Sequence, residues 1–318
     1  MNSNARVVVT GASGFIGSNI IHALFNAGVE AHAFVRERSN LWRLQPVIEK
    51  IHLHYVDLLD EKSTVRSLQR VMPTDIIHAA VYGGYPFQKD AATIIRTNAI
   101  GFQNILTALE LLNGATLINL GSSSEYGFKQ FPMRETDLLE PYSIYGASKA
   151  AATIIGRAYA LEHGLKIHTL RLFSPYGYWE EPSRLIPSAI VHALKNKDFH
   201  MTAGTQGRDF IFIEDVARVI IKTDFSALPP GGVYNLGAGI EVNVYEVVRL
   251  IFRLVHTKGK IIRGSLQARG NDSKTPWRAD MSLSSQALSV GRLTPLAEGL
   301  SRTIKWINEH MEHYTLRE

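Results

Sequence analysis

The 318-residue sequence contains no cysteine, which excludes disulfide scaffolds, thiolate metal sites and cysteine nucleophiles. It has no apolar run of membrane-spanning length and no hydrophobic signal segment before the first expected strand. It also lacks a dense run of Lys and Arg of the kind that binds nucleic acid. We therefore expect a cytoplasmic protein that binds neither membranes nor nucleic acid, with no metal ion in its site.

The charge of the chain is nearly balanced, with 34 Lys and Arg against 29 Asp and Glu and a formal net charge of +5. This excess is compatible with attracting phosphorylated substrates, and equally with a slightly basic surface of no function. Hydrophobic residues make up 45% of the chain, enough for the core of one large domain or of a domain with a smaller lobe.

Short apolar segments alternate with helical patterns through the first half of the chain. Strands are expected at 6–10, 29–35, 51–56, 75–79, 116–120 and 166–172, with helices at 11–27, 91–112 and 143–163. This alternation predicts an α/β fold with a doubly wound parallel sheet that binds its ligands at the carboxyl ends of the strands.

After about Gly177 the connections become longer and richer in proline, glycine and tryptophan. Helices are still expected at 184–196, 215–225, 244–256 and 296–310. We expect residues 1–177 to form the sheet domain and residues 178–318 to form mainly a smaller C-terminal lobe, interwoven with the first.

Three glycines, Gly11, Gly14 and Gly17, lie between the first strand and the first helix. The first permits a tight turn, the second lets the backbone approach a pyrophosphate, and the third lets helix and strand pack closely. The helix N-terminus then offers free N–H groups to the phosphates. The loop predicts a Rossmann-type dinucleotide site.

The end of the second strand distinguishes the two nicotinamide dinucleotides, because an acidic residue there binds the adenosine ribose whereas an arginine accommodates a 2′-phosphate. Arg36 occupies this position, and Arg38 and Ser39 follow. In the alternative interpretation Arg36 is a solvated charge and Glu37 binds the ribose. NADP(H) is favoured, and NAD(H) remains possible.

Tyr145 and Lys149 are four residues apart and lie on one face of the expected helix. A nearby ammonium favours the phenolate, so we expect Lys149 to lower the pKa of Tyr145. Tyr145 then exchanges a proton with the reacting oxygen, and Lys149 also holds the nicotinamide ribose.

Together these features resemble the extended short-chain dehydrogenase/reductases, the NAD-dependent epimerase/dehydratase family that modifies nucleotide sugars. The glycine loop, Thr10-Gly11-Ala12-Ser13-Gly14-Phe15-Ile16-Gly17, is similar to that of the extended branch. The resemblance implies that residues 1–177 bind NAD(P) and that the C-terminal lobe binds a nucleotide sugar. It implies these cofactor contacts: Gly11, Ser13, Gly14, Phe15, Ile16, Gly17, Arg36, Asp57, Leu58, Ala79, Ala80, Tyr145, Lys149 and Phe173.

A catalytic serine is expected after the fifth strand, where a hydroxyl stabilises the charge that develops on the substrate oxygen. Aligned on Glu125 the resemblance points to Ser123, which we prefer, and aligned on Tyr126 it points to Ser122. In the family's 4,6-dehydratases a glutamate in this segment is the base at carbon 5. Glu125 is therefore a candidate catalytic base, or else a structural acceptor for backbone amides.

Substrate contacts are also implied by the resemblance. Arg208 and Arg269 match arginines that reach the diphosphate of the nucleotide sugar, as bidentate guanidinium groups can. Ser174 stands where relatives usually have asparagine, and Tyr82 belongs to a loop beside the substrate.

We expect a reductase that converts an NDP-4-keto-6-deoxysugar at carbon 4, because the NADP preference favours it. The alternative is a 4-epimerase or 4,6-dehydratase that recycles its cofactor within one turnover. A non-catalytic dinucleotide sensor is disfavoured by the presence of both Tyr145 and Lys149, and a small-ketone reductase by the segment at Arg208. The resemblance also implies a homodimer that pairs the helices at 91–112 and 143–163.

Overall fold

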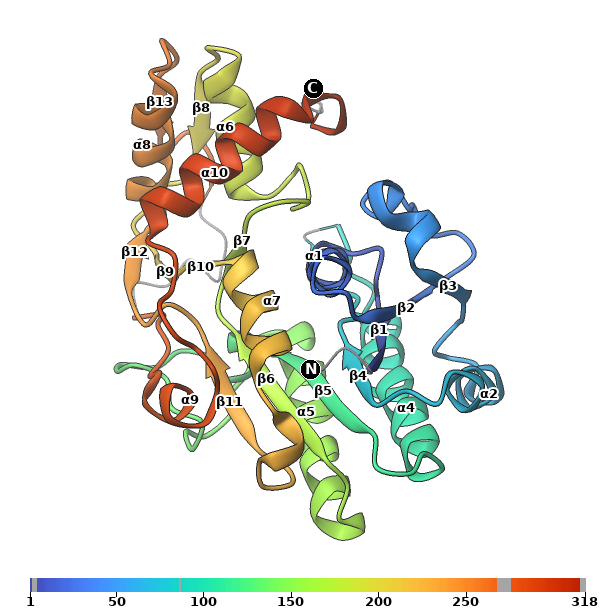
Figure 1. The fold of residues 1–318 in the computed structure, drawn as a ribbon. Helices are drawn as coiled ribbons and strands as arrows, with labels where there is room; N and C mark the ends of the chain where they lie inside the picture. Colours follow the sequence, from blue (N-terminus) through green and yellow to red (C-terminus); the bar gives the residue numbers. More distant parts are fainter. Residues whose placement is uncertain (2–4, 86, 268–275, 315–318) are drawn as a thin grey trace.

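A seven-stranded parallel sheet forms the centre of the computed structural model, which describes residues 1, 5–85, 87–267 and 276–314 (Figure 1). Its strands lie in the order β11-β6-β5-β4-β1-β2-β3. Their bounds are β1 (Arg6–Thr10), β2 (Glu30–Val35), β3 (His52–Tyr55), β4 (Asp75–His78), β5 (Thr116–Ser122), β6 (Ile167–Leu172) and β11 (Val233–Leu236). The expected α/β doubly wound sheet is thereby confirmed.

The central strands are buried on both faces, which is why they read as unbroken apolar runs. In β1, Val7, Val8 and Val9 are fully buried, and their branched side chains suit the pleated sheet. Since neighbouring strands of this sheet are parallel, all their carboxyl ends lie at the same edge. That edge collects the loops after β1, β2, β4 and β5.

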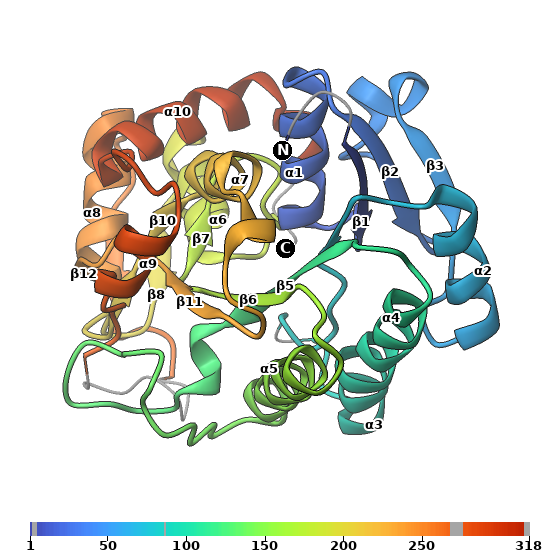
Figure 2. The same cartoon turned by 60° about the horizontal axis from the view of Figure 1, so that its bottom comes forward.

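Helices cover both faces of the sheet, as Figure 2 shows. One face carries α2 (Glu61–Val71), α4 (Gly101–Glu110) and α5 (Ile144–His163), which pack side by side. The other carries α1 (Phe15–Asn26) and α7 (Ile213–Lys222), which also pack together. Each layer has its own apolar core against the sheet.

The continuous helix expected at 91–112 is wrong in one respect. The segment consists of α3 (Ala91–Ile95), the π-helical turn η2 (Arg96–Ile100) and α4. Within the turn, the buried Asn98 donates from Nδ2 to the Tyr82 carbonyl and to Ser148 Oγ, both at sequence-distant positions. These tertiary hydrogen bonds accompany the local widening of the helix, a feature common at functional sites.

The second half of the chain forms a lobe of helices beside the sheet and returns β11 to it (Figure 1). The helices α6 (Leu185–Leu194), α8 (Val244–Val255) and α10 (Leu296–Glu309) pack on one another. Three small pairings complete it: β7 (Pro175–Tyr176) with β10 (Ile211–Phe212), β9 (Gly207–Asp209) with β12 (Glu241–Asn243), and β8 (Phe199–Met201) with β13 (Ile261–Arg263).

The remaining elements are short. They are α9 (Ser282–Ala287) and the 3-10 turns η1 (Gln45–Lys50), η3 (Ser123–Glu125), η4 (Phe225–Ala227) and η5 (Met311–His313). Among the residues that the structure describes, no helix has the length and apolarity needed to cross a membrane.

Candidate active site

The glycine loop after β1 leaves no room for side chains. Gly11 has a φ of +62°, and a Cβ placed there would lie 2.6 Å from the Cα of Ala80, at the end of the neighbouring strand β4. A Cβ at Gly17 would lie 2.3 Å from the Gly11 carbonyl oxygen. The loop therefore packs directly on Ala79 and Ala80, both expected cofactor contacts, and the small residues keep the strand ends close together.

The start of α1 fits an anionic group. Gly14 caps the helix without a side-chain hydrogen bond, and the first turn contains no acidic residue. The amides of this turn are thus left to a ligand, and the helix dipole favours a negative charge there. Ser13, Phe15 and Ile16 are half-buried around this turn. The residues present accordingly fit a dinucleotide pyrophosphate.

The residues expected to bind the adenosine end follow β2 and β3 at the same edge. Arg36 is exposed, and its backbone N–H donates to Ser39 Oγ at 3.0 Å. Asp57 accepts from the Leu59 amide through Oδ1 at 3.0 Å, and Leu58 is half-buried. Both an arginine and a carboxylate are therefore available at this edge.

Tyr145 lies in the first turn of α5, which Ser143 caps by accepting from the Gly146 amide. Burial raises the pKa of the Tyr145 phenol, and hydrogen bonding to the Ser122 hydroxyl acts in the opposite direction. The expectation that Lys149 lowers this pKa is wrong for the structure described, since burial dominates. Of the two serines considered, the structure brings Ser122 to Tyr145.

Lys149 is 2% exposed, one turn further along α5. Burial lowers the pKa of its ammonium to about 8, and the nearby charge of Glu125 opposes this shift. Lys149 makes no hydrogen bond to any residue in the described part of the chain, so its ammonium is left for a ligand such as a ribose hydroxyl. Behind it, the fully buried His78 contacts Thr10 Oγ1 through Nδ1 at 2.8 Å.

Glu125 is fully buried, and both of its carboxylate oxygens are engaged. Oε1 accepts from the Ser122 backbone amide at 2.8 Å, which completes a capping box on η3. Oε2 accepts from Arg171 Nε at 2.8 Å. This arrangement matches the structural role that the sequence left open, although here the acceptor serves one amide and one guanidinium.

Ser123 contacts the C-terminal half of the chain. Its Oγ accepts from Trp277 Nε1 at 3.1 Å, and the serine is 5% exposed. The guanidinium of Arg208 lies over the Trp277 ring, 5.2 Å from its centroid. Ser123 therefore connects β5 to the segment that was expected to bind the substrate diphosphate.

The other expected substrate contacts lie in separate segments of the chain. Tyr82 is half-buried, and its backbone is held by Asn98 through two hydrogen bonds. Ser174 is half-buried with a φ of +22°. Phe173, an expected cofactor contact, is fully buried and packs against Tyr126 and Trp277, so its side chain belongs to the core. Arg269 lies outside the described residues.

Sequence reasoning missed three residues at this site. Asn98, in the π-helical turn, was hidden inside an expected regular helix. Arg171 lies in an expected strand, and its pairing with Glu125 spans 46 positions. Arg184, just before α6, acts electrostatically on Tyr145 and lies 3.7 Å from the Glu180 carboxylate. The tripeptide Ser122-Ser123-Ser124 could not show which serine faces Tyr145, because that depends on where β5 ends.

Glu180 is an unusual neighbour of Arg184. Burial raises the pKa of its carboxyl to about 7, and the Arg184 guanidinium lowers it in part. Arg184 also donates to the Gly84 carbonyl at 3.3 Å, so it connects the segment before α6 with the loop after β4. In that loop a Cβ at Gly83 would lie 3.4 Å from the Tyr145 ring, which places the loop directly beside the phenol.

Comparison with known proteins agrees with this geometry. The model of the NAD dependent epimerase/dehydratase family matches residues 7–237. UDP-glucuronate 4-epimerase 6 of Arabidopsis thaliana is 30% identical over 330 residues, which cover 94% of this chain and 71% of that protein. The dTDP-glucose 4,6-dehydratase of Streptomyces griseus is 25% identical over 321 residues, covering 96% and 94%.

A solved structure extends the likeness to the fold. MoeE5 in complex with UDP-glucuronic acid and NAD has a TM-score of 0.84 and 28% identity, covering 96% of this chain and 99% of that one. The family model covers most of the chain, and the glycine loop, Tyr145 and Lys149 all lie within it. The chain belongs to the NAD-dependent epimerase/dehydratase family, within the extended short-chain dehydrogenase/reductases.

Proposed function

We propose that this protein is a 4-epimerase of a UDP-sugar, with UDP-glucuronate as the first candidate substrate. This replaces the 4-ketoreductase that the sequence favoured with the alternative it left open. The support comes from relatives such as the Arabidopsis thaliana UDP-glucuronate 4-epimerase and from the arrangement of Ser122, Tyr145 and Lys149 at one strand edge.

One observation carries the choice between epimerase and dehydratase. A 4,6-dehydratase needs a carboxylate free to remove the proton at carbon 5, and Glu125 is the candidate in this segment. Its two oxygens are occupied by the Ser122 amide and the Arg171 guanidinium, and the side chain has no exposed surface. Releasing it would leave a buried arginine without its counter-ion, which is costly. Glu125 is therefore assigned a structural role, and the reaction an epimerisation.

The chain's own residues supply the proton chemistry of such a reaction. Bound nicotinamide dinucleotide would take hydride from carbon 4 of the sugar and return it. Tyr145 accepts the proton of the 4-hydroxyl through its phenolic oxygen and gives it back when the new configuration forms. The Ser122 hydroxyl, beside that oxygen, donates to the substrate oxygen, and the buried Lys149 ammonium would bind a ribose hydroxyl of the dinucleotide.

Arg184 supports a uronate as the sugar. A UDP-glucuronate differs from UDP-glucose by a carboxylate on the sugar ring, and a guanidinium is the side chain best suited to bind one. The Arg184 side chain is 44% exposed, and its charge acts on Tyr145, so it lies close to the reacting group. Its partner Glu180 lies 3.7 Å away, longer than a hydrogen bond, so a substrate carboxylate can compete for the guanidinium.

For the cofactor we propose NAD, as in the MoeE5 complex, held through the whole reaction. The exposed Arg36 at the end of β2 is the one observation that favours NADP(H), and with it a 4-ketoreductase as the second candidate function. A reductase exchanges its cofactor on every turnover, whereas an epimerase retains it. Retention through purification therefore separates these two candidates.

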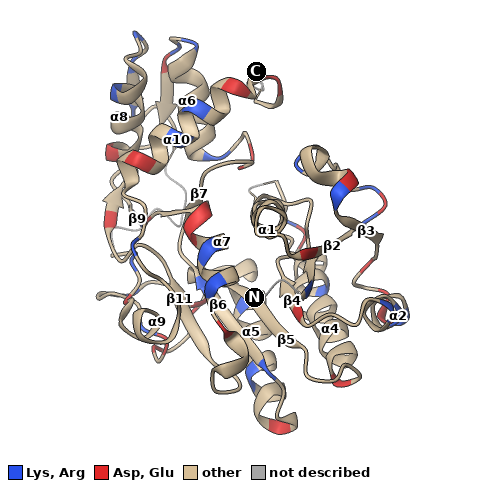
Figure 3. Cartoon of the chain, in the orientation of Figure 1, with Lys and Arg blue, Asp and Glu red and all other residues tan. Residues whose placement is uncertain are grey.

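We also propose that the protein is a homodimer formed through α3, α4 and α5. Figure 3 shows few charged residues along α4, whose one charged residue is Glu110. Large apolar side chains on α3, η2 and α5 are exposed: Ile95, Ile100, Ile154 and Leu161. Exposed apolar groups on neighbouring helices suit a helix-to-helix interface. Light scattering during gel filtration measures the mass directly.

The deciding experiment incubates protein purified without added cofactor with UDP-glucuronate, UDP-glucose and dTDP-glucose in separate reactions. Proton NMR of the sugar products distinguishes a C4 epimer from a 4-keto-6-deoxysugar. We expect the C4 epimer, formed without added NAD, and nicotinamide dinucleotide released from the protein by denaturation.

Two other results would replace the proposal. A 4-keto-6-deoxysugar product would establish a dehydratase and return Glu125 to a catalytic role. Failure with all three sugars, together with oxidation of NADPH in the presence of an NDP-4-keto-6-deoxysugar, would establish the reductase.

A further inference from the structure

Four chemically active side chains lie together on one face of the sheet, at the edge opposite the glycine loop. Glu30 and His32 are two residues apart on β2, and His52 and His54 are two residues apart on β3. Residues two apart in a strand point to the same face. The parallel register places His32 opposite His52, so the four side chains form one compact group at the edge of the sheet.

Three of these side chains converge on one point. The Glu30 carboxylate oxygen Oε1 lies 3.0 Å from His32 Nε2 and 3.6 Å from His52 Nε2. The three potential ligand atoms lie within 4.8 Å of one another. The rings of His32 and His52 stack with centroids 4.6 Å apart and an angle of 18°, so both rings present Nε2 toward the same carboxylate.

These separations match a zinc site. Zinc–nitrogen bonds of about 2.0–2.1 Å in a tetrahedron put neighbouring ligand atoms about 3.3–3.4 Å apart. The observed 3.0 Å and 3.6 Å lie on either side of that value. Little movement is needed to reach coordination, and a water molecule would complete the tetrahedron on the exposed side of Glu30 and His52.

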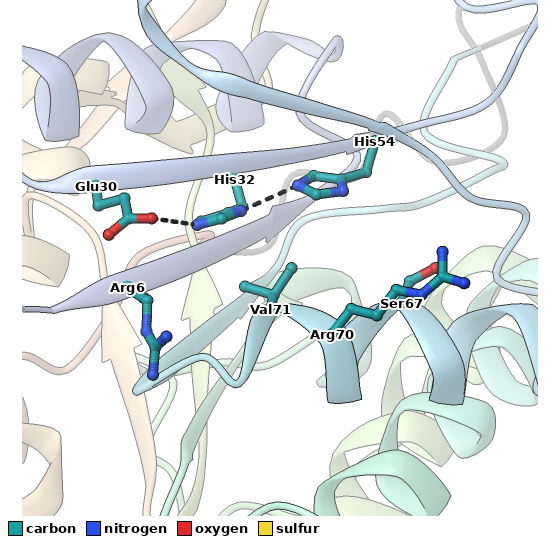
Figure 4. Close-up of a pocket in the computed structure, with 7 residues that line it drawn as sticks. All are labelled: Arg6, Glu30, His32, His54, Ser67, Arg70 and Val71. Atoms are coloured by element: carbon teal, nitrogen blue, oxygen red, sulfur yellow. Dashed lines mark hydrogen bonds and ion pairs between the residues drawn. The ribbon is translucent and has the colours of Figure 1, made fainter.

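The fourth residue, His54, supports the first histidine from behind. His32 Nδ1 lies 3.0 Å from His54 Nε2, as Figure 4 shows. Metal-binding histidines commonly donate their second ring N–H to such an acceptor, which fixes the ring and the tautomer.

From this geometry we propose that Glu30, His32 and His52 bind one divalent transition-metal ion, with Zn²⁺ as the best fit and His54 holding His32 in place. Two imidazoles and one carboxylate suit borderline ions, whereas Mg²⁺ and Ca²⁺ require more oxygen ligands. Arg6 and Arg70 line the same pocket, and their positive charges oppose any cation there, so the binding depends on the three ligands (Figure 4).

The site would stabilise the sheet rather than take part in the reaction. Glu30 and His52 are the first residues of their strands, so the site lies at the amino end of the sheet, opposite the edge that bears Tyr145. It joins β3 to β2. Because β3 is the edge strand, backbone hydrogen bonds otherwise hold it on one side alone. A metal that binds only the folded chain raises the melting temperature, and the stabilisation grows with the logarithm of the metal concentration divided by its Kd.

The test uses the full chain, freed of metal by a chelator, and titrates it calorimetrically with ZnCl₂. We expect one equivalent to bind, a rise in melting temperature, and, with Co²⁺ instead, the intense visible absorption of a tetrahedral cobalt centre. Glu30→Gln and His52→Asn should each lower the affinity by at least about tenfold, the range seen when metal-site groups are removed.

His313→Asn is the matched control, because His313 lies 3.5 Å from the Glu312 carboxylate and has no third ligand beside it among the described residues. It should bind Zn²⁺ as the unaltered protein does. The proposal is overturned if the unaltered protein takes up no Zn²⁺ at stoichiometric concentrations. It is equally overturned if Glu30→Gln and His52→Asn bind as tightly as His313→Asn, or if Co²⁺ shows only the weak absorption of an octahedral ion.

Discussion

Arg171 on β6 and Glu125 in η3 form an ion pair of 2.8 Å whose side chains are 4% and 0% exposed. The same guanidinium donates to Tyr126 Oη at 2.9 Å, and that hydroxyl donates to Asn235 Oδ1 on β11. The pair thus connects the serine-bearing end of β5 to the last strand of the sheet. It holds Glu125 where its carboxylate caps Ser122.

Replacing Arg171 by Met should destabilise the protein strongly, because it leaves the buried Glu125 carboxylate without its counter-ion. We expect a loss of about 3–5 kcal/mol in the free energy of unfolding, measured by urea denaturation. The exposed pair of Arg249 and Glu246 is the control, and Arg249→Met should cost about 1 kcal/mol or less. Equal losses of unfolding free energy in the two variants would show that burial does not increase the contribution of the Arg171–Glu125 pair.

Replacing Tyr145 by Phe should lower the rate of epimerisation by about 10²–10⁴-fold, the usual contribution of a general acid–base group. The phenol is the group that exchanges the proton, whereas the ring itself is retained. Tyr159, on the same helix, bonds Gln103 through its hydroxyl and lies outside the site, so Tyr159→Phe should retain the rate. A Tyr145→Phe variant with the full rate would remove the phenol from the mechanism.

Replacing each serine by alanine should affect a different property: mainly kcat for Ser122 and mainly stability for Ser123. Ser122→Ala removes the hydroxyl beside Tyr145 and should lower kcat, with a cost of about 1 kcal/mol in stability because that hydroxyl also caps η3. Ser123→Ala leaves the buried Trp277 Nε1–H without its acceptor and should cost about 1–3 kcal/mol of stability with a smaller effect on kcat. Steady-state kinetics and thermal unfolding of both variants show which serine is catalytic and which is structural. The reverse pattern would restore the serine that the sequence favoured.

Arg184→Gln tests the uronate assignment within one protein. Because the guanidinium is proposed to bind the sugar carboxylate, KM for UDP-glucuronate should rise by about tenfold or more, the equivalent of one charge-assisted hydrogen bond. UDP-glucose lacks that carboxylate and serves as the internal control, so its KM should stay nearly constant. An equal increase in KM for both sugars would show that Arg184 maintains the shape of the site and does not bind the sugar carboxylate.

His78 should make the stability of the protein depend on pH in the acid range. Burial, with a smaller effect from Lys149, lowers its pKa from 6.5 to about 3. Between these values the unfolded chain binds the proton and the folded chain does not, so this contribution is complete above pH 6.5 and is lost as the pH falls toward 3. His78→Asn should reduce the slope of unfolding free energy against pH between about pH 5 and about pH 6.5.

The control for that slope is His256→Asn. His256 is exposed and adopts φ of +54°, a conformation that asparagine also tolerates. Its slope should equal that of the unaltered protein. If His78→Asn has the same slope as well, the buried histidine is not the group that titrates.

The sequence predicted what depends on local spacing and missed what depends on distant contacts. The glycines of the dinucleotide loop and the pair Tyr145 and Lys149 follow from one turn and one helical period, so the sequence could place them in the fold. The π-helical turn at Asn98 arises from hydrogen bonds to Tyr82 and Ser148, which no window of neighbouring residues contains.

The sequence could not decide between the two serines for a related reason. The strand was expected to end at residue 120, but β5 continues to Ser122. Glu125 then folds back to cap that residue because Arg171, on the next strand, neutralises it. An alignment on Glu125 treats this glutamate as catalytic, whereas the buried pairing explains its position without catalysis.

The place of β11 has a consequence for how the protein is made. β11 (Val233–Leu236) pairs with β6 (Ile167–Leu172), yet it leaves the ribosome some sixty residues later, roughly several seconds at ordinary translation rates. Throughout that interval the nascent chain exposes one long side of β6 as an open edge, which other strands can join. A gene divided near residue 177 would make that exposure permanent, so the two halves are expected to remain soluble only when they are synthesised as one chain.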